Sequence, residues 1–274
     1  MNFEAALQYA RKHQPQALVA VCDGEVAVED YDNGFMPDTA HALYSGTKSF
    51  WGVAALAARD DGILALDERV AETLDEWHGD PVKDAITARM LLQMTAGYGF
   101  GGLGASVPTY ERALGMALKN VPGAAFTYSG IPLQVFGAFF DRKLAKRKQS
   151  PHEYLRERVL EPAGVTVTSW RSLPDGTQTL PTGAMLTANA WLAYGRYVLS
   201  RAAELTEAFT GSQANPRYGL GWWLGASHAP ADLVYASGSA GQALYLVPSL
   251  SLAIVRYGKS ASYKHDAFLR KLFE

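Results

Sequence analysis

Hydrophobic and polar positions follow a strand-like pattern at both ends of the chain. Residues 17–32 read as two apolar, partly alternating segments joined by Asp23-Gly24, which is typical of a hairpin with a tight turn. Beyond residue 217, three short apolar segments are separated by turn residues, at 218–225, 234–248 and 250–258. These segments predict three more antiparallel strands.

Helical spacing of apolar residues dominates the middle of the chain and returns at its two ends. A long helix is expected to open near Ser45 and to stop at Gly62. The glycine-rich segment 97–108 interrupts the helical pattern and is expected to form a mobile loop of the kind that borders a site. The other segments with helical spacing are 4–13, 86–94, 109–120, 131–145, 150–164, 186–202 and 262–274.

Strands at both ends and helices between them predict an α+β fold. We expect an antiparallel sheet formed from both chain termini and flanked by helices, with a mainly helical inserted lobe. Residues 1–274 are interpreted as one domain, a size that can bury a substantial core. The sheet lobe is expected at about 1–44 and 217–274, and the helical lobe at about 45–216.

Charge and composition exclude several classes of partner. The 25 Lys and Arg residues nearly balance the 27 Asp and Glu residues, which gives no electrostatic reason to expect nucleic acid or an anionic membrane. No segment approaches the ~20 apolar residues of a membrane span. Because residues 1–16 lack the apolar core of a signal peptide, we expect a cytoplasmic protein. The oligomeric state is not predicted.

Several common chemical motifs are missing. The single cysteine, Cys22, excludes an intramolecular disulfide and is interpreted as a buried strand residue. There is no G-x-S-x-G elbow, no H-E-x-x-H and no paired-cysteine pattern. The six histidines are scattered and are interpreted as surface or structural residues. No metal and no cofactor are therefore expected.

Ser45 and Lys48 form an S-x-x-K pattern, of which about one is expected by chance in a chain of this size. Residues three apart share one face of a helix, so the lysine can reach the serine hydroxyl. The surrounding residues 42–58 are almost wholly uncharged apart from Lys48, which favours burial of the amine. A buried amine loses its proton more easily and can then activate a serine. The alternative is a solvent-facing lysine on a helix start.

Other segments, taken together with this pair, resemble the serine beta-lactamase and penicillin-binding-protein superfamily, in particular its class C-like branch. Ser45-Gly46-Thr47-Lys48 matches the first motif of that family. Residues 86–100 resemble its "LLxHTSG" segment, with Gln93 where histidine is usual. Tyr128-Ser129-Gly130 matches the second motif, Y-x-N, after a "VPGAAF" lead. The resemblance covers nearly the whole chain in order.

The third motif of the family is a lysine or histidine followed by x-G, and Ala236-Ser237-Gly238 stands at that place. Gly130 therefore replaces the asparagine of the second motif, and Ala236 replaces the cation or imidazole of the third. In the family these groups position the substrate amide and bind a carboxylate. Their replacement argues against a beta-lactamase or D-Ala carboxypeptidase, although Arg256 or Lys259 could supply another cation.

The resemblance implies a hydrolase that forms an acyl-enzyme on Ser45. Lys48 would accept the serine proton, directly or through a Tyr128 phenolate, and Tyr128 would protonate the leaving group. The backbone N–H groups of Ser45 and Ser239 would form the oxyanion hole. Candidate substrate-binding residues are Ser237, Gly238, Tyr98 and Gln242, and further candidates for the pocket wall are Tyr44, Trp222 and Trp223.

Three functions are compatible with this sequence. The favoured one is a serine hydrolase, of esterase or amidase type, that acts on a small-molecule ester or amide. The second is an enzyme that recognises penicillins despite Ala236. The third is a non-catalytic member of the family that binds a ligand or a partner.

Overall fold

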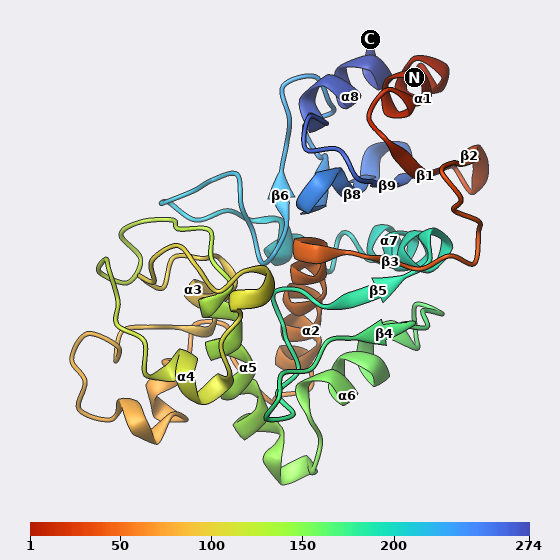
Figure 1. The fold of residues 1–274 in the computed structure, drawn as a ribbon. Helices are drawn as coiled ribbons and strands as arrows, with labels where there is room; N and C mark the ends of the chain where they lie inside the picture. The colour runs from red at the N-terminus through yellow and green to blue at the C-terminus, as the bar shows by residue number, and fades with distance from the viewer.

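The computed structural model describes residues 1–274, and its largest sheet is built from both ends of the chain. The six strands pair antiparallel in the order β2-β1-β9-β8-β7-β6. Figure 1 shows the N-terminus and the C-terminus side by side above this sheet. The strands are β1 Pro15–Cys22, β2 Glu25–Tyr31, β6 Trp223–Leu224, β7 Val234–Gly238, β8 Gln242–Val247 and β9 Leu252–Gly258. The predicted α+β fold is thereby confirmed.

The hairpin β1–β2 turns at the predicted place. Asp23 and Gly24 both have positive φ, at 49° and 86°, the conformation of a type I′ turn. The first strand then pairs along its other edge with the last one, with Val19 opposite Val255. This long-range pairing joins the two ends of the chain into one sheet.

Both faces of the sheet are covered by helices. Successive strand residues therefore enter two different apolar clusters, one on each face. Leu18 and Ile254 face α1 (Phe3–Arg11) and α8 (His265–Phe273), the helices nearest the termini. Val19 and Val255 face the larger core, which also contains α2 (Ser49–Asp60) and α7 (Ala188–Ser200). Strand β8 is buried along its full length as a result.

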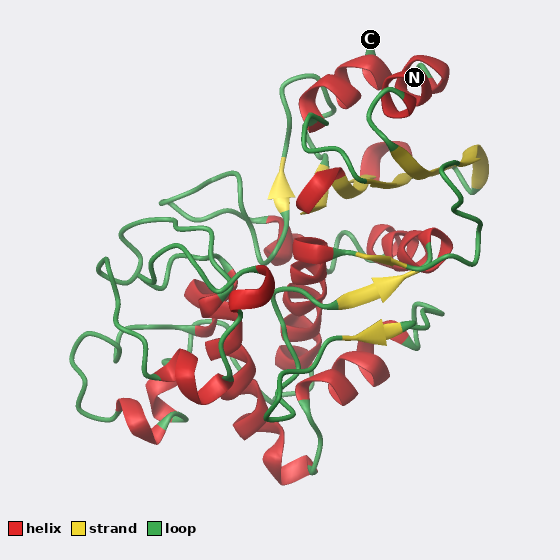
Figure 2. Cartoon of the chain, in the orientation of Figure 1, coloured by secondary structure: helices red, strands yellow, loops and turns green.

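The remaining helices gather at the other end of the molecule, where long loops connect them (Figure 2). They are α3 Ala88–Leu92, α4 Tyr110–Leu114, α5 Ile131–Leu144 and α6 Pro151–Leu155. Helix α4 is shorter than the predicted 109–120 because the chain leaves the helix at Gly115. Helix α6 starts with a Ser150–Glu153 capping box and continues as one π-helical turn, Arg156–Leu160.

Two parts of the predicted sheet pattern are wrong. Residues 234–248 form two strands, since Ala240 and Gly241 adopt positive φ of 61° and 83° and reverse the chain between β7 and β8. A second sheet of three very short strands, in the order β3-β5-β4, was not expected. Its strands are β3 His41–Ala42, β4 Ser169–Trp170 and β5 Ala184–Leu186.

The glycine-rich loop 97–108 is tied to its surroundings by backbone hydrogen bonds, and its mobility stays a prediction. The carbonyl of Gly97 accepts from the amides of Lys119 and Asn120 at 2.8 and 3.0 Å. The carbonyl of Gly101 accepts from the amide of Gly130 at 2.9 Å. The loop thus lies directly against the segment that carries Tyr128.

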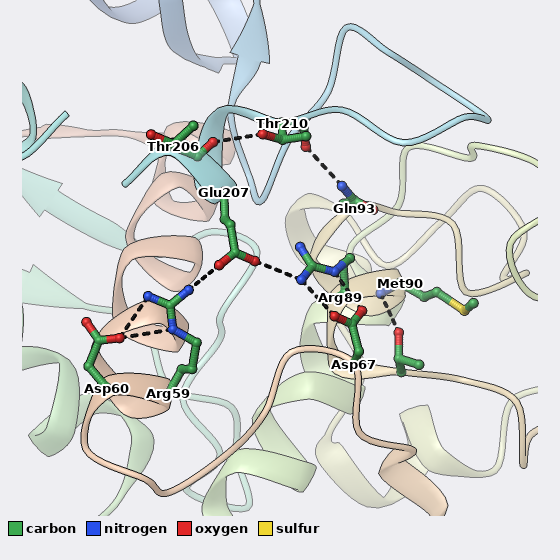
Figure 3. Close-up of polar contacts among 10 residues, drawn as sticks. Arg59, Asp60, Asp67, Arg89, Met90, Gln93, Thr206, Glu207 and Thr210 are labelled. Carbon is green, nitrogen blue, oxygen red and sulfur yellow. Dashed lines mark hydrogen bonds and ion pairs between the residues drawn. The ribbon is translucent and has the colours of Figure 1, made fainter. Parts of the chain in front are cut away.

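A polar network links α2, α3 and the short 3-10 turn Thr206–Phe209 (Figure 3). Glu207 bridges Arg59 and Arg89, and its contact with Arg89 is 2.8 Å long. Gln93, at the position where the family usually has histidine, donates to the carbonyl of Thr210 at 3.0 Å. Gln93 therefore ties the end of α3 to the residue that follows this turn.

None of the helices combines the length and the apolar character needed to cross a membrane. Cys22 ends β1 and is partly exposed, so it is less buried than predicted.

Candidate active site

Ser45 and Lys48 lie together at the start of the central helix. Residues Tyr44–Lys48 form a 3-10 turn that runs directly into α2. Tyr44, just before the serine, has a positive φ of 47°, an uncommon conformation that concentrates at functional sites. The Nζ atom of Lys48 is 2.8 Å from Oγ of Ser45. The S-x-x-K spacing therefore produces the contact that a catalytic pair requires.

Lys48 is buried without a carboxylate partner. Its side chain is 1% exposed, and its second hydrogen bond goes to the carbonyl of Pro181 at 2.9 Å. The indole N–H of Trp51 donates to the neighbouring carbonyl of Leu180 at 2.7 Å. Burial alone lowers the pKa of Lys48 to about 7. Much of the lysine is neutral near pH 7 and can accept a proton.

Tyr128 completes the cluster from the segment that precedes α5. Lys48 Nζ lies 4.9 Å from the centre of the Tyr128 ring, and the ring stacks on Trp223 at 5.6 Å between centroids. Burial, offset in part by the Ser45 hydroxyl, raises the pKa of Tyr128 to about 12. The phenol therefore keeps its proton at neutral pH.

These groups open into a cavity of about 340 Å³. Strand β7 forms one wall and approaches the backbone before Ser45 so closely that any Cβ at Gly238 would collide with the carbonyl of Leu43. The wall contains no Lys, Arg, Asp or Glu side chain. The lining residues are Ser45, Tyr128, Trp223, Tyr235, Ser237, Gly238, Ser239 and His265.

Strand alternation decides what the third motif presents to the cavity. Tyr235 and Ser237 face it, whereas Ala236 is 1% exposed and packs in the main core. Arg256 does not replace the missing cation, because its guanidinium donates to the carbonyls of Gly241 and His13 at 2.7 and 2.8 Å. Lys259 is exposed and also lies outside the cavity lining.

Four of the residues suggested for the pocket lie elsewhere. Tyr98 and Trp222 are 2% and 0% exposed and belong to the main core. Gln242 is fully buried because its side chain donates to the carbonyl of Gly258 at 2.6 Å and accepts from the amide of the same residue at 3.0 Å. Tyr44 is 41% exposed and does not line the cavity. The structure therefore gives Gln242 a structural position.

Sequence reasoning missed two residues of the cavity, Tyr235 and His265. His265 begins the last helix, and its Nε2 is 3.0 Å from Oγ of Ser237. Its Nδ1 is 2.6 Å from the hydroxyl of Tyr245. No spacing in the sequence connects position 265 with Ser45, so only the fold brings both residues to one cavity.

The loss of the second-motif asparagine has a steric counterpart. A Cβ added at Gly130 would collide with the carbonyl of Gly102 and would lie 3.1 Å from Cγ of Pro181. The glycine-rich loop fills the space that a side chain at position 130 would need. The glycine at position 130, in place of the asparagine of the motif, is thus what allows the loop to pack so closely.

Other candidate sites are less complete. A larger cavity, of about 560 Å³, lies beside α6 and β4 and is lined by His152, Glu153 and Trp170 among others. Its Ser150 hydroxyl donates to the carboxylate of Glu153 at 2.8 Å as part of the α6 capping box, and no lysine lines this cavity. No group of three or more His, Cys, Asp or Glu side chains could hold a metal ion.

Several solved structures resemble this chain over nearly its whole length. Similar solved structures include a beta-lactamase from Mycobacterium bovis, with a TM-score of 0.69 and 21% identity over 98% of this chain and 95% of that chain. A penicillin-binding protein homologue from Caulobacter crescentus has a TM-score of 0.75 and 19% identity, over 100% and 96%. EstCE1, described as a hydrolase with promiscuous acyltransferase activity, has a TM-score of 0.77 and 16% identity, over 99% and 96%.

At these identities the solved structures establish the shared fold. A search among curated protein sequences gives no significant match. The model of the beta-lactamase family matches residues 3–272, which is nearly the whole chain. The protein therefore belongs to the beta-lactamase family.

Proposed function

We propose that the protein is a serine hydrolase that cleaves a small ester or amide through an acyl-enzyme on Ser45. The observation that carries this proposal is the 2.8 Å contact between Ser45 Oγ and a lysine amine that is 1% exposed. A serine hydroxyl becomes a useful nucleophile when a neighbouring base can take its proton. The neutral form of Lys48 is such a base.

In the first half of the reaction, Ser45 Oγ attacks the carbonyl carbon while its proton passes to Lys48. The negative charge on the carbonyl oxygen would be received by the backbone N–H groups of Ser45 and Ser239, both of which line the cavity. The bond to the leaving group then breaks. Tyr128 gives its proton to the departing oxygen or nitrogen and regains one from the Lys48 ammonium.

In the second half, water attacks the acyl-enzyme. The Lys48 amine takes a proton from that water. The resulting Lys48 ammonium then gives a proton to Ser45 Oγ as the ester bond to the acyl group breaks. A Tyr128 phenolate is the less suitable base, because burial raises the pKa of this phenol to about 12. Lys48 is thus assigned the role of general base and Tyr128 that of proton donor.

The lining of the cavity favours an uncharged substrate. Its wall carries no Lys or Arg, Ala236 faces the core, and Arg256 is committed to two backbone carbonyls. A penicillin carboxylate would find no cation there. We therefore favour neutral esters or amides over penicillins.

Hydrolysis of 4-nitrophenyl butyrate by the wild type, Ser45→Ala and Ser239→Ala tests this function. We expect turnover by the wild type and by Ser239→Ala, because Ser239 contributes only its backbone, and loss of turnover in Ser45→Ala. Benzylpenicillin is expected to be neither hydrolysed nor bound covalently. Equal turnover by Ser45→Ala and the wild type would refute the nucleophile, and a penicillin adduct would refute the preference for neutral substrates.

A further inference from the structure

A line of four polar groups runs from the interior of the sheet lobe to the cavity. The hydroxyl of Tyr263 is 3.0 Å from that of Tyr245, which is 2.6 Å from Nδ1 of His265. Nε2 of His265 is in turn 3.0 Å from Oγ of Ser237. Tyr245 and Tyr263 are 1% and 5% exposed, whereas Ser237 borders the cavity. The Ser237 hydroxyl is therefore connected to a buried network.

The hydrogen atoms of this network have a preferred direction. Tyr263 has no acceptor other than Tyr245 for its hydroxyl hydrogen. If Tyr263 donates to Tyr245, Tyr245 can donate to Nδ1 of His265, and Nε2–H can then donate to Ser237. The reverse order would leave the buried Tyr263 hydrogen without a partner, which is unfavourable. The favoured order leaves the hydrogen of Ser237 free to point into the cavity.

The imidazole must be neutral for this order, and its surroundings keep it so. Burial lowers the pKa of His265 to about 4, with a smaller contribution from the Arg256 charge and against an opposite effect of Asp266 that is smaller still. In the neutral ring one nitrogen donates and the other accepts. The hydroxyl of Tyr245 at Nδ1 thus selects the tautomer that carries its proton on Nε2.

A row of rings along the cavity wall indicates which part of the substrate Ser237 meets. Tyr128 stacks on Trp223, with 5.6 Å between ring centroids. Trp223 and Tyr235 are 6.5 Å apart, and Tyr235 and His265 are 5.3 Å apart. Tyr128 and His265 therefore stand at opposite ends of the row. The acyl group is placed at the end with Ser237 and His265 on the assumption that the leaving group, which takes its proton from Tyr128, occupies the other end.

We propose that His265 is a positioning residue that fixes Ser237 as a hydrogen-bond donor to a neutral carbonyl oxygen on the acyl group of the substrate. This inference rests on the proposed function, because it assumes an acyl-enzyme on Ser45. The substrate class is an ester or amide whose acyl chain carries a second carbonyl. A carboxylate at the same place would lack a cation in the cavity wall.

Two matched esters test the inference, 4-nitrophenyl 4-oxopentanoate and 4-nitrophenyl 4-methylpentanoate. In the second ester a methyl group and a hydrogen on C4 take the place of the carbonyl oxygen of the first. The wild type is expected to prefer the oxo ester in kcat/KM by about 3- to 10-fold, the range of one neutral hydrogen bond. His265→Leu, Ser237→Ala and Tyr245→Phe are expected to bring the ratio toward one, mainly through KM of the oxo ester. His265→Gln, whose amide can donate to Ser237, is expected to restore part of the preference.

A purely structural role for His265 would lower kcat/KM for both esters equally and keep their ratio, which would overturn the inference. A wild-type ratio near one would overturn it as well. If His265→Leu fails to fold, as judged by thermal unfolding, Ser237→Ala and Tyr245→Phe decide the question by the same ratio.

Fluorophosphonate labelling of the same proteins distinguishes a failure of the proposed function from a failure of the role of His265. A labelled Ser45 with an unchanged ester ratio in the variants refutes only the role of His265. No label and no hydrolysis in the wild type refute the proposed function, and the inference with it. A label on Ser237 in Ser45→Ala would show that Ser237 and His265 are themselves a nucleophilic pair, contrary to the positioning role.

Discussion

Nζ of Lys48 lies 2.8 Å from Oγ of Ser45, at a place where no carboxylate balances its charge. An ammonium group in such surroundings is costly, so the lysine releases its proton at lower pH. The same burial that costs stability thus produces the base that a serine nucleophile needs.

Acylation of Ser45 should depend on the protonation of Lys48. Burial lowers the pKa of Lys48 to about 7, and only the neutral amine can accept the serine proton. The rate of fluorophosphonate labelling is therefore expected to rise with pH through about 7 and then to level off. Lys48→Arg, which keeps a cation that cannot lose its proton, is expected to label at least about 100-fold more slowly. A flat pH profile between 5 and 9, or normal labelling of Lys48→Arg, would contradict this role.

Tyr128→Phe should distinguish leaving groups. A 4-nitrophenolate departs without a proton, whereas an alkoxide or an amide nitrogen needs one. We expect the substitution to reduce kcat for an alkyl ester or an amide about 100-fold and to reduce kcat for a 4-nitrophenyl ester less than about 10-fold. Steady-state rates on matched acyl groups measure this difference. An equal loss on both kinds of ester would mean that Tyr128 does not supply the proton.

Gly130→Asn would restore the usual residue of the second family motif and should nevertheless do harm. Its Cβ would collide with the carbonyl of Gly102, so the loop 97–108 would have to move away from Tyr128. We expect destabilisation by about 2 kcal/mol or more, seen as a lower Tm, together with slower labelling of Ser45.

Gly115→Asn is the matched control for this substitution. Gly115 is exposed and has a φ of -77°, close to the -90° of Gly130, and an added Cβ there would lie 3.7 Å from the nearest atom, an ordinary contact. Little change in Tm is expected. If Gly130→Asn behaves like this control, the steric account of the second motif is wrong.

His152 should contribute to the loss of stability, measured as the free energy of unfolding, at acid pH. This imidazole packs against Trp51 and Trp170, and burial lowers its pKa to about 3. Between the unfolded pKa of about 6.5 and that value the unfolded state binds the extra proton, so the free energy of unfolding falls as pH decreases. One such group contributes at most about 1.4 kcal/mol per pH unit.

Denaturant unfolding of His152→Leu measures this contribution. Nε2 of His152 has no hydrogen-bond partner, so leucine removes the titrating group without leaving a partner unsatisfied. Stability is expected to fall less steeply from pH 6 to pH 4 than in the wild type. The exposed His78, replaced by leucine, serves as the control. Equal slopes for all three proteins would refute the buried neutral state of His152.

Features that depend on local pattern could be predicted from the sequence. The β1–β2 hairpin follows from Asp23-Gly24, and α2 from its apolar run after Lys48. The small sheet could not be predicted in this way, because its strands span two or three residues and show no alternation. Their pairing depends on packing between distant segments.

The residues of the candidate site also fall into those that a local motif predicts and those that only the fold brings together. Ser45, Lys48 and Tyr128 stand in recognisable motifs, and the structure brings them together. His265 enters the cavity from the last helix, and no local pattern signals that contact. Gln242 looked suited to a pocket, but its amide completes the backbone hydrogen bonds of Gly258 instead. A polar side chain in a strand can form hydrogen bonds with buried backbone groups as readily as it can bind a ligand.

The central claim is an activated Ser45, and intact-mass spectrometry after exposure to a fluorophosphonate tests it most directly. Ser239→Ala is the matched control, since this serine lines the same cavity but is assigned only a backbone role. The account predicts one adduct on the wild type and on Ser239→Ala, mapped to Ser45 by peptide analysis, and none on Ser45→Ala. An unlabelled wild type, or an adduct that persists in Ser45→Ala, would contradict the account.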